Sequence, residues 1–398
     1  VTYEKGKTIE TIGMETYNFD DIRSYNTEEI PAAMERLCNQ KPFMKVVSTL
    51  FPLMPKEQLK QKMLSFTSST ELQLQMVYPF LQYLEANMTT GICLTGLENI
   101  DIEKKYLYIS NHRDIILDSA LLCAKFIEKK IDTVEIAIGD NLLVYPWIED
   151  LVRVNRSFIV QRGLNARQVL ESSKRLSAYL RHTLNERKKS IWIAQREGRA
   201  KDSNDLTQES LLKMFNLAGA SGSFTDNLKE LNICPLSISY EFDPCDYLKA
   251  REFQLKRDNP EYKKTPEDDL INMQTGVMGY KGKVVYHISG CINDSLDIIA
   301  RDTQNRNEQI EKAAQLIDYH IHKNFTITAN NKIAYDEIYG DKDYAKDYTT
   351  AEKISFEEYL DKQIRKIDLE NKDRDFLRRK MLEMYANPLK NYLKANGL

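Results

Sequence analysis

From about residue 96 to residue 300, short apolar segments alternate with segments whose apolar residues recur at helical spacing. Short apolar runs are typical of buried strands, and strand–helix alternation over such a length favours a sheet covered by helices. We therefore predict an α/β domain over 96–300, built on a mixed, mostly parallel sheet flanked by helices. The expected strands are 106–109, 134–138, 158–160, 191–194, 233–239 and 284–288, and the clearest helix between them is 166–187.

A helical region is predicted before this domain, over residues 1–95. Helices are expected at 28–38, capped by Asn26 with Glu29, and at 56–64. A third is expected at 69–85 and should be kinked by Pro79, which lacks an N–H group. Its apolar stripe is expected to pack in the core, with a lipid surface as the alternative.

A second helical region is predicted over 301–398, with helices at 304–324, 355–366 and 373–387. Ser355 and Glu358 are expected to cap the second helix, and Pro388 to end the third. That third helix carries the basic residues Arg374, Arg378, Arg379 and Lys380. A solvated face is expected for them, with contact to anionic lipid as the alternative.

Residues 243–275 interrupt the strand–helix pattern with charged residues and proline. We expect a solvated insertion there. A lid over the strand ends is the alternative.

The charge balance, the cysteines and the lengths of the apolar runs indicate which partners and which compartment to expect. The chain has 56 Lys and Arg residues against 59 Asp and Glu, which speaks against a nucleic-acid partner. Its six cysteines are scattered and favour reduced thiols in a cytosolic protein. The apolar runs are shorter than the roughly 18–20 residues that span a bilayer, and no secretory leader is seen. His320 and His322 are two residues apart and diverge on a helix, so no metal site is expected.

A polar corner at 110–114 follows the predicted strand 106–109 and precedes an apolar run that contains Asp118. In open α/β sheets, ligands bind at such a strand end, and the following helix N-terminus favours negative charge. His112 in this corner is followed closely by carboxylates. A carboxylate fixes the tautomer of an imidazole and stabilises its protonated form, as general-base catalysis requires.

Three further blocks follow, each beside a predicted strand. Arg162 stands just beyond strand 158–160, and the tripeptide 197–199 with Lys201 follows strand 191–194. Pro235 lies near the start of strand 233–239. Gly198 permits a tight turn. The guanidinium of Arg199 can donate two parallel hydrogen bonds to phosphate oxygens, whereas the ammonium of a lysine acts as a point charge.

In this order, the four blocks resemble those of the glycerolipid acyltransferases, the family of glycerol-3-phosphate and 1-acylglycerol-3-phosphate acyltransferases. The resemblance covers about residues 96–240. The family has an aspartate five places after the histidine, whereas here that place holds Leu117. Asp118 is assigned the role because apolar residues follow it, with Asp114 as the alternative. Gln161 stands where the family often has a second arginine, for which Arg153 or Arg156 would compensate. The resemblance implies His112 and Asp118 as catalytic residues, and Arg162, Glu197, Gly198, Arg199, Lys201 and Arg156 as substrate-binding residues.

The resemblance also implies a step of phospholipid biosynthesis. A fatty acyl group would pass from acyl-CoA or acyl carrier protein to a hydroxyl of glycerol 3-phosphate, lysophosphatidate or a related precursor. No metal or organic cofactor is implied, and the enzyme is expected in the cytoplasm, peripheral to the inner face of the membrane. Two alternatives stay open. One is an O-acyltransferase for an aminolipid or another non-phosphate acceptor; the other is a catalytically silent relative that binds acyl chains or membranes.

Overall fold

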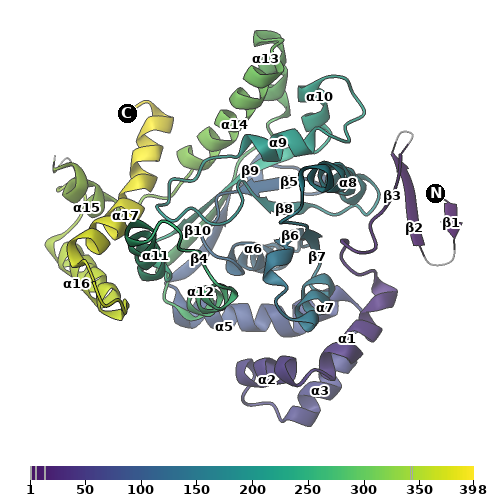
Figure 1. The fold of residues 1–398 in the computed structure, drawn as a ribbon, viewed down its shortest axis with the longest axis horizontal. Coiled ribbons are helices and arrows are strands. Elements are labelled where there is room, and N and C mark those ends of the chain that lie inside the picture. Colours follow the sequence, from purple (N-terminus) through teal and green to yellow (C-terminus); the bar gives the residue numbers. More distant parts are fainter. Residues whose placement is uncertain (1, 5–6, 13–14, 341, 343) are drawn as a thin grey trace.

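The computed structural model describes residues 2–4, 7–12, 15–340, 342 and 344–398. A seven-stranded sheet lies at its centre, in the order β4-β10-β9-β5-β8-β6-β7 (Figure 1). Neighbouring strands are parallel except for β9 and β10, which are antiparallel. The predicted fold class, a mixed and mostly parallel sheet flanked by helices, is confirmed. The strands are β4 Gly91–Thr95, β5 Leu107–Ser110, β6 Glu135–Gly139, β7 Ser157–Val160, β8 Ile191–Ala194, β9 Ile233–Tyr240 and β10 Lys283–Ile288.

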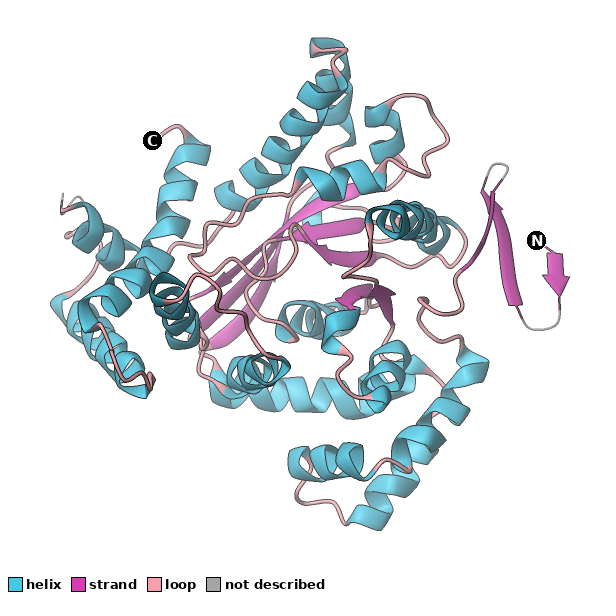
Figure 2. Cartoon of the chain, viewed as in Figure 1, coloured by secondary structure: helices cyan, strands magenta, loops and turns pink. Residues whose placement is uncertain are grey.

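Both faces of the sheet are buried, which explains why its strands read as continuous apolar runs. Alternate residues of β5 enter two different apolar clusters, Leu107 and Ile109 on one face and Tyr108 on the other. Helices α8 (Ala166–Asn185) and α14 (Arg306–Lys323) contribute to the first cluster. Helices α5 (Tyr78–Met88) and α6 (Leu117–Glu128) contribute to the second. Figure 2 shows the central strands surrounded by helices.

The N-terminal region differs from its prediction at both ends. Strands β1 (Thr2–Glu4), β2 (Lys7–Ile12) and β3 (Glu15–Asn18) form a separate antiparallel sheet, so residues 2–18 are not helical where they are described. Strand β4 belongs to the central sheet, so the α/β region begins before residue 96.

Helices α1 (Ile30–Cys38), α2 (Lys41–Leu50) and α3 (Lys56–Leu64) follow the first sheet, and α3 has its predicted bounds. Helix α4 (Ser69–Leu72) continues into α5 through a π-helical turn, Gln73–Val77. Pro79 is the second residue of α5, next to that turn, where the helical hydrogen-bond ladder is already rearranged, so the run continues to Met88. Leu72, Met76, Leu81 and Leu84 are buried, so this stripe packs in the core as expected.

The segment expected to be a solvated insertion forms two packed helices, α11 (Asp246–Asp258) and α12 (Pro266–Met278). Asp246, Lys249 and Ala250 on α11 are buried. The expectation of a solvated segment is therefore wrong.

Helices α13 (Asn293–Asp302), α14, α15 (Ala329–Tyr339), α16 (Thr350–Lys366) and α17 (Arg374–Asn396) complete the chain. Helix α16 begins earlier than predicted because Thr349 caps it: the Thr349 hydroxyl accepts from the Glu352 N–H at 3.1 Å. Ser355 therefore lies inside the helix. Helix α17 continues through Pro388, contrary to prediction, because residues on both sides, including Tyr385 and Leu389, are buried.

Candidate active site

The loop that joins β5 to α6 is fixed to the sheet by Asn111. The Asn111 Nδ2 donates to the Ile238 carbonyl, and its Oδ1 accepts from the Ile238 N–H, both at 2.8 Å. This buried side-chain amide extends the pairing of β5 with β9 by one residue. His112 is consequently held at the carboxyl end of the parallel strands, where the loops after β7 and β8 also emerge.

His112 and Asp118 are in hydrogen-bonding contact. The His112 Nδ1 lies 2.8 Å from the Asp118 Oδ2, and that oxygen also accepts the backbone N–H groups of Arg113, at 2.6 Å, and Asp114, at 3.0 Å. Asp118 lies in the first turn of α6, and only 1% of its side chain is exposed. An imidazole that donates from Nδ1 to a carboxylate leaves Nε2 free to accept a proton.

Asp114, the alternative partner of His112, has another contact. Its Oδ1 accepts the N–H groups of Ile116, at 2.9 Å, and Leu117, at 2.8 Å, at the start of α6. Burial raises the pKa of the Asp114 carboxyl, and the nearby charge of Asp118 raises it further. The additional residue of this block is accommodated in the loop, so Asp118 still reaches the histidine ring.

Arg162 and Glu197 are brought together at the ends of β7 and β8. The Arg162 Nη1 lies 2.9 Å from the Glu197 Oε1, and 68% of the Glu197 side chain is exposed. A Cβ at position 139 would lie 2.6 Å from the Arg162 Nε, so the close approach of Arg162 to the end of β6 requires the glycine found there. Gly198 has a φ of +67°, which makes the tight turn that the sequence indicates.

Arg199 and Lys201 are held by residues of the inserted helices. The Arg199 Nη2 donates to the Asn272 Oδ1 at 3.0 Å, and the Cys245 side chain also lies beside this guanidinium. Lys201 pairs with Glu252. Burial lowers the pKa of Lys201 to about 8, although Glu252 opposes this shift.

One cavity of about 1790 Å³ joins His112 to these groups. Helices α2, α5 and α7 (Pro146–Val154) contribute mainly apolar residues to its wall, among them Phe43, Leu50, Phe80 and Trp147. The loops after β7 and β8 and the inserted helices contribute positive charge. The basic residues on this side are Arg162, Arg196, Arg199, Lys201, Lys256 and Lys264, against the acidic Glu197 and Asp269.

Arg156 is not part of this constellation. Its guanidinium donates to Asp132 at 2.6 Å and to the hydroxyls of Thr133, at 2.6 Å, and Thr70, at 2.8 Å, and it does not line the cavity. The sequence motif predicts that an arginine is near, but the direction of its side chain follows from tertiary packing.

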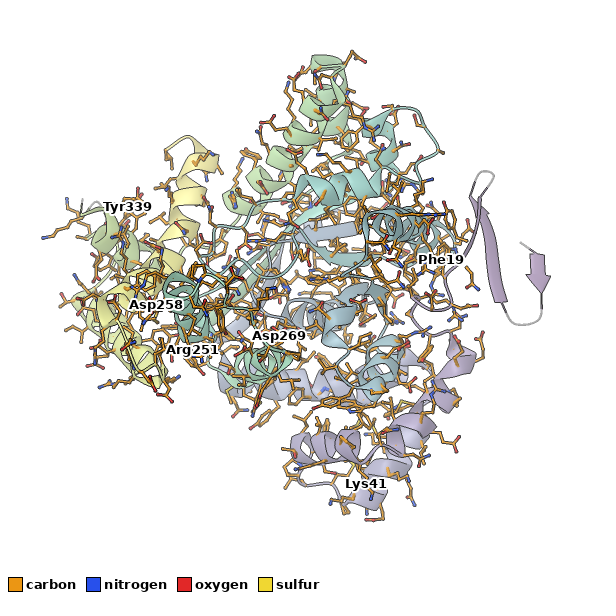
Figure 3. The ribbon with its side chains drawn as sticks, viewed as in Figure 1. Phe19, Lys41, Arg251, Asp258, Asp269 and Tyr339 are labelled. Carbon is orange, nitrogen blue, oxygen red and sulfur yellow. The ribbon has the colours of Figure 1, made fainter. Side chains whose placement is uncertain are left out.

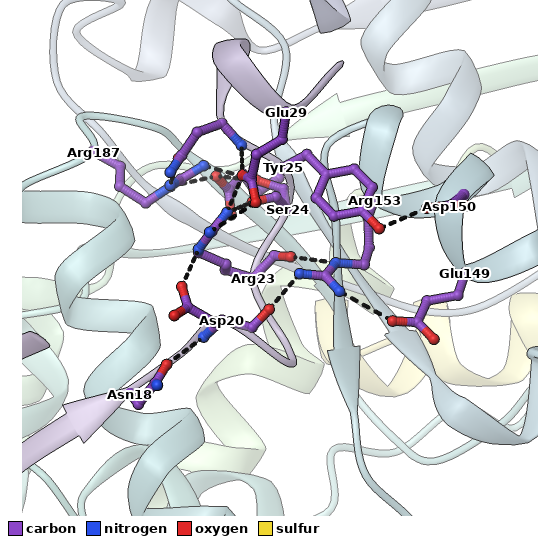
Figure 4. A network of polar contacts seen from close by, with 12 residues as sticks. Asn18, Asp20, Arg23, Ser24, Tyr25, Glu29, Glu149, Asp150, Arg153 and Arg187 are labelled. Atoms are coloured by element: carbon purple, nitrogen blue, oxygen red, sulfur yellow. Dashed lines mark hydrogen bonds and ion pairs between the residues drawn. The ribbon is translucent and has the colours of Figure 1, made fainter. Parts of the chain in front are cut away.

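Arg153 is also engaged elsewhere. Its guanidinium donates to the Arg23 carbonyl at 2.9 Å, pairs with Glu149 at 3.0 Å and stacks over the Tyr25 ring (Figure 4). Neither Arg153 nor Arg156 compensates for Gln161, which does line the cavity.

Two basic residues of the site region were missed from sequence. Arg196 lines the cavity and has no hydrogen-bond or ion-pair partner in the described parts of the chain. Its position next to Glu197 was a usable signal. Arg113 is buried beside His112, where it donates to the Ser203 hydroxyl at 2.6 Å and pairs with Asp205.

Asn272 and Glu252, which hold Arg199 and Lys201, were also missed. Both belong to a segment whose charge and proline content indicated solvent exposure, so no local signal identified them.

His320 and His322 belong to α14. The His322 Nε2 contacts the Asp205 carbonyl at 2.9 Å, and burial lowers the pKa of His322 to about 4. Within the described residues, no cluster of three or more His, Cys, Asp or Glu side chains is arranged to hold a metal ion. No helix in the same residues has the length and apolar character to cross a membrane.

Residues 91–239 match the family model described as Acyltransferase. This range runs from β4 into β9 and contains all four sequence blocks. Among solved structures, the chain is similar to the crystal structure of the 1-acyl-sn-glycerophosphate (LPA) acyltransferase, PlsC, from Thermotoga maritima. The identity is 12% and the TM-score 0.35, over 73% of this chain and 93% of that one. No curated protein sequence matches the chain.

Proposed function

Since residues 91–239 match the acyltransferase family model and carry the four blocks that resemble those of the glycerolipid acyltransferases, we propose that this enzyme acylates a phosphate-bearing lipid precursor. The acyl group passes from acyl-CoA or acyl carrier protein to a hydroxyl of glycerol 3-phosphate, lysophosphatidate or a related molecule. The observation that carries the proposal is the 2.8 Å contact of His112 with Asp118 at the wall of a cavity that also holds several cations.

In the proposed mechanism, the His112 Nε2 takes the proton of the acceptor hydroxyl while the hydroxyl oxygen attacks the thioester carbonyl. The new C–O bond forms, the C–S bond of the tetrahedral intermediate breaks, and the thiolate receives the proton from the imidazolium. Asp118 orients the ring and stabilises its charged form. General-base catalysis of this kind contributes roughly 10²–10⁴-fold in rate.

The charge of the cavity supports an anionic acceptor. Arg162, Arg199 and Lys201 supply positive charge for a phosphate, and Arg196 adds a cation that no other described residue pairs with. Glu197 holds Arg162 in place. The apolar wall formed by α2, α5 and α7 suits an acyl chain.

The donor is a substrate, so the proposed reaction uses neither a metal ion nor a bound organic cofactor. Because its products are lipids, we place the enzyme in the cytoplasm, in peripheral contact with the inner face of the membrane.

A second candidate is O-acylation of an aminolipid or another acceptor without phosphate. It is favoured by Gln161, a neutral residue of the cavity wall for which Arg153 and Arg156 do not substitute. The third interpretation, a silent relative, would be favoured if the additional residue in the first block kept Asp118 away from His112. The His112 Nδ1 lies 2.8 Å from the Asp118 Oδ2, which removes that argument.

An acceptor screen tests the proposal. Wild-type protein and His112→Ala are incubated with labelled acyl-CoA and acyl carrier protein and with candidate acceptors, and the products are identified by lipid mass spectrometry. We expect acylation of a phosphate-bearing acceptor by the wild type and none by the variant. Full activity of His112→Ala would end the proposal. An acylated neutral or amine-bearing product that glycerol 3-phosphate does not suppress would select the second candidate.

A further inference from the structure

Helices α11 and α12 lie outside the segment that matches the family model, yet they contact its charged blocks. Figure 3 marks them by Arg251 and Asp258 on α11 and by Asp269 on α12. Lys256 on α11, Lys264 in the connection between the helices and Asp269 line the cavity.

Each helix holds one cation of the candidate phosphate site. Glu252 on α11 pairs with Lys201, and the Asn272 Oδ1 on α12 accepts from the Arg199 Nη2 at 3.0 Å. Only 8% of the Glu252 side chain is exposed. A nearly buried carboxylate needs a charged partner, and the same carboxylate compensates Lys201 for its lost hydration.

Helix α12 also packs directly on the corner that carries His112. A Cβ at Gly276 would lie 2.0 Å from the Asp114 Oδ2, so only glycine permits this approach. The position of α12, and with it that of Asn272, is therefore fixed relative to the first block.

We propose that Glu252 and Asn272 are positioning residues of the acceptor site, acting on phosphate affinity through Lys201 and Arg199. This rests on the proposed function. Glu252 holds the Lys201 ammonium at the cavity wall. Asn272 holds one side of the Arg199 guanidinium and thereby orients this cavity-lining cation toward the acceptor phosphate.

The groups around Lys201 give the proposal a pH dependence. Burial lowers the pKa of Lys201, Glu252 raises it, and Lys264 and Lys256 lower it. A lysine binds an anion only in its protonated form, so affinity is present below a pH of about 8 and falls as the pH rises through that value. Without Glu252 the remaining groups lower the Lys201 pKa further, and the loss begins nearer neutral pH.

The test measures binding of sn-glycerol 3-phosphate by titration calorimetry between pH 6 and pH 9, and acylation kinetics alongside. Glu252→Gln should weaken binding about twofold at neutral pH and about tenfold near pH 9, with little change in mild acid, because those are the changes in the protonated fraction of Lys201 when its pKa falls by about one unit from about 8. Asn272→Ala should weaken binding at every pH. Both variants should raise the acceptor KM while kcat and the donor KM stay within about twofold. Glu267→Gln, an exposed change of the same charge on α12, is the matched control and should bind as the wild type does.

Two further variants separate action through Lys201 from a general structural effect. Glu252→Gln should have no additional effect in a Lys201→Met background, and Lys201→Arg should restore binding to Glu252→Gln at high pH. Lys201→Arg alone should remove the loss of affinity near pH 8, a result that does not depend on Glu252→Gln folding well.

Unchanged binding in both Glu252→Gln and Asn272→Ala would overturn the proposal, as would an undiminished Glu252→Gln effect in the Lys201→Met background. Wild-type protein that does not bind sn-glycerol 3-phosphate would overturn it too. The expected binding pattern without acyl transfer would instead refute the proposed function and leave this inference standing.

Discussion

The corner after β5 and the helices α11 and α12 hold their charged groups in different ways. In the corner, His112 contacts a carboxylate six residues along the chain, and that carboxylate is itself held by neighbouring N–H groups. In the inserted helices, Glu252 and Asn272 lie 51 and 73 residues from the cations they hold. The contact of the proposed catalytic pair is therefore specified by a short stretch of sequence, whereas the contacts proposed to position the binding cations depend on tertiary packing. We therefore expect the rate of acyl transfer and the affinity for the acceptor to respond to different mutations.

The largest expected effect comes from Asp118. Asp118→Asn should lower kcat by about 10²–10⁴-fold because the ring loses the carboxylate that fixes its tautomer. The measurement is single-turnover acyl transfer, with circular dichroism to verify the fold.

Asp114→Asn is the matched comparison for Asp118→Asn. It should keep most of the rate, since asparagine also caps a helix well, and cost less than about 1 kcal/mol of unfolding free energy. An inactive Asp114→Asn beside an active Asp118→Asn would transfer the catalytic role to Asp114.

A smaller effect is expected from Gly276→Ala, which tests whether α12 must pack against the corner. The added methyl group would displace α12 or Asp114, so we expect an acceptor KM several times higher and a loss of about 1–3 kcal/mol in unfolding free energy. Denaturant unfolding and steady-state kinetics measure the two quantities.

Gly222→Ala is the control for Gly276→Ala, because a Cβ at Gly222 meets nothing within 4 Å. Equal behaviour of the two alanine variants would mean that the close approach of α12 has no functional weight.

Arg156→Ala should affect stability but not binding. Its guanidinium bonds to Asp132, Thr133 and Thr70, so the variant should lose about 1–3 kcal/mol of unfolding free energy and keep its acceptor KM. A raised acceptor KM at unchanged stability would indicate that Arg156 contributes to acceptor binding.

The smallest effect is expected from Glu197→Gln. Glu197 pairs with Arg162 in an exposed position, and exposed ion pairs contribute about 0–1 kcal/mol and are screened by salt. The acceptor KM should change less than about threefold, and the difference from wild type should shrink at high ionic strength. A large loss of activity that salt does not diminish would assign Glu197 a direct role in catalysis.

The parts of the fold that could be predicted are those specified locally. The central strands β5, β8 and β9 are buried on both faces, so their apolar runs were visible, whereas the partly exposed edge strand β4 was not predicted. Helix α3 was predicted with its bounds. A contact between His112 and a carboxylate was predictable for the same reason, because His112, Asp114 and Asp118 lie within one strand–helix corner, whereas the choice of Asp118 over Asp114 came from the resemblance.

The errors concern choices that local sequence does not decide. Both Ser355 and Thr349 precede a glutamate at capping distance, and packing selected Thr349. Pro388 was expected to end α17, but burial of the residues around it outweighs the missing hydrogen bond. The Arg156 side chain turns away from the site, and the polar residues 243–275 fold onto it, since ion pairs over long sequence separations leave no local pattern.

The antiparallel pairing of β9 with β10 has a consequence for how this enzyme can diversify. Tyr240, the last residue of β9, pairs with Val284 at the beginning of β10, so the chain leaves and re-enters the sheet at one edge. The segment inserted between them, α11 and α12, borders the cavity that His112 lines, and a hairpin-type connection of this kind can change in length without a shift of the strands. A longer or shorter segment at this point, evolved or engineered, would change which acceptors fit the cavity and would leave the contact between His112 and Asp118 unchanged.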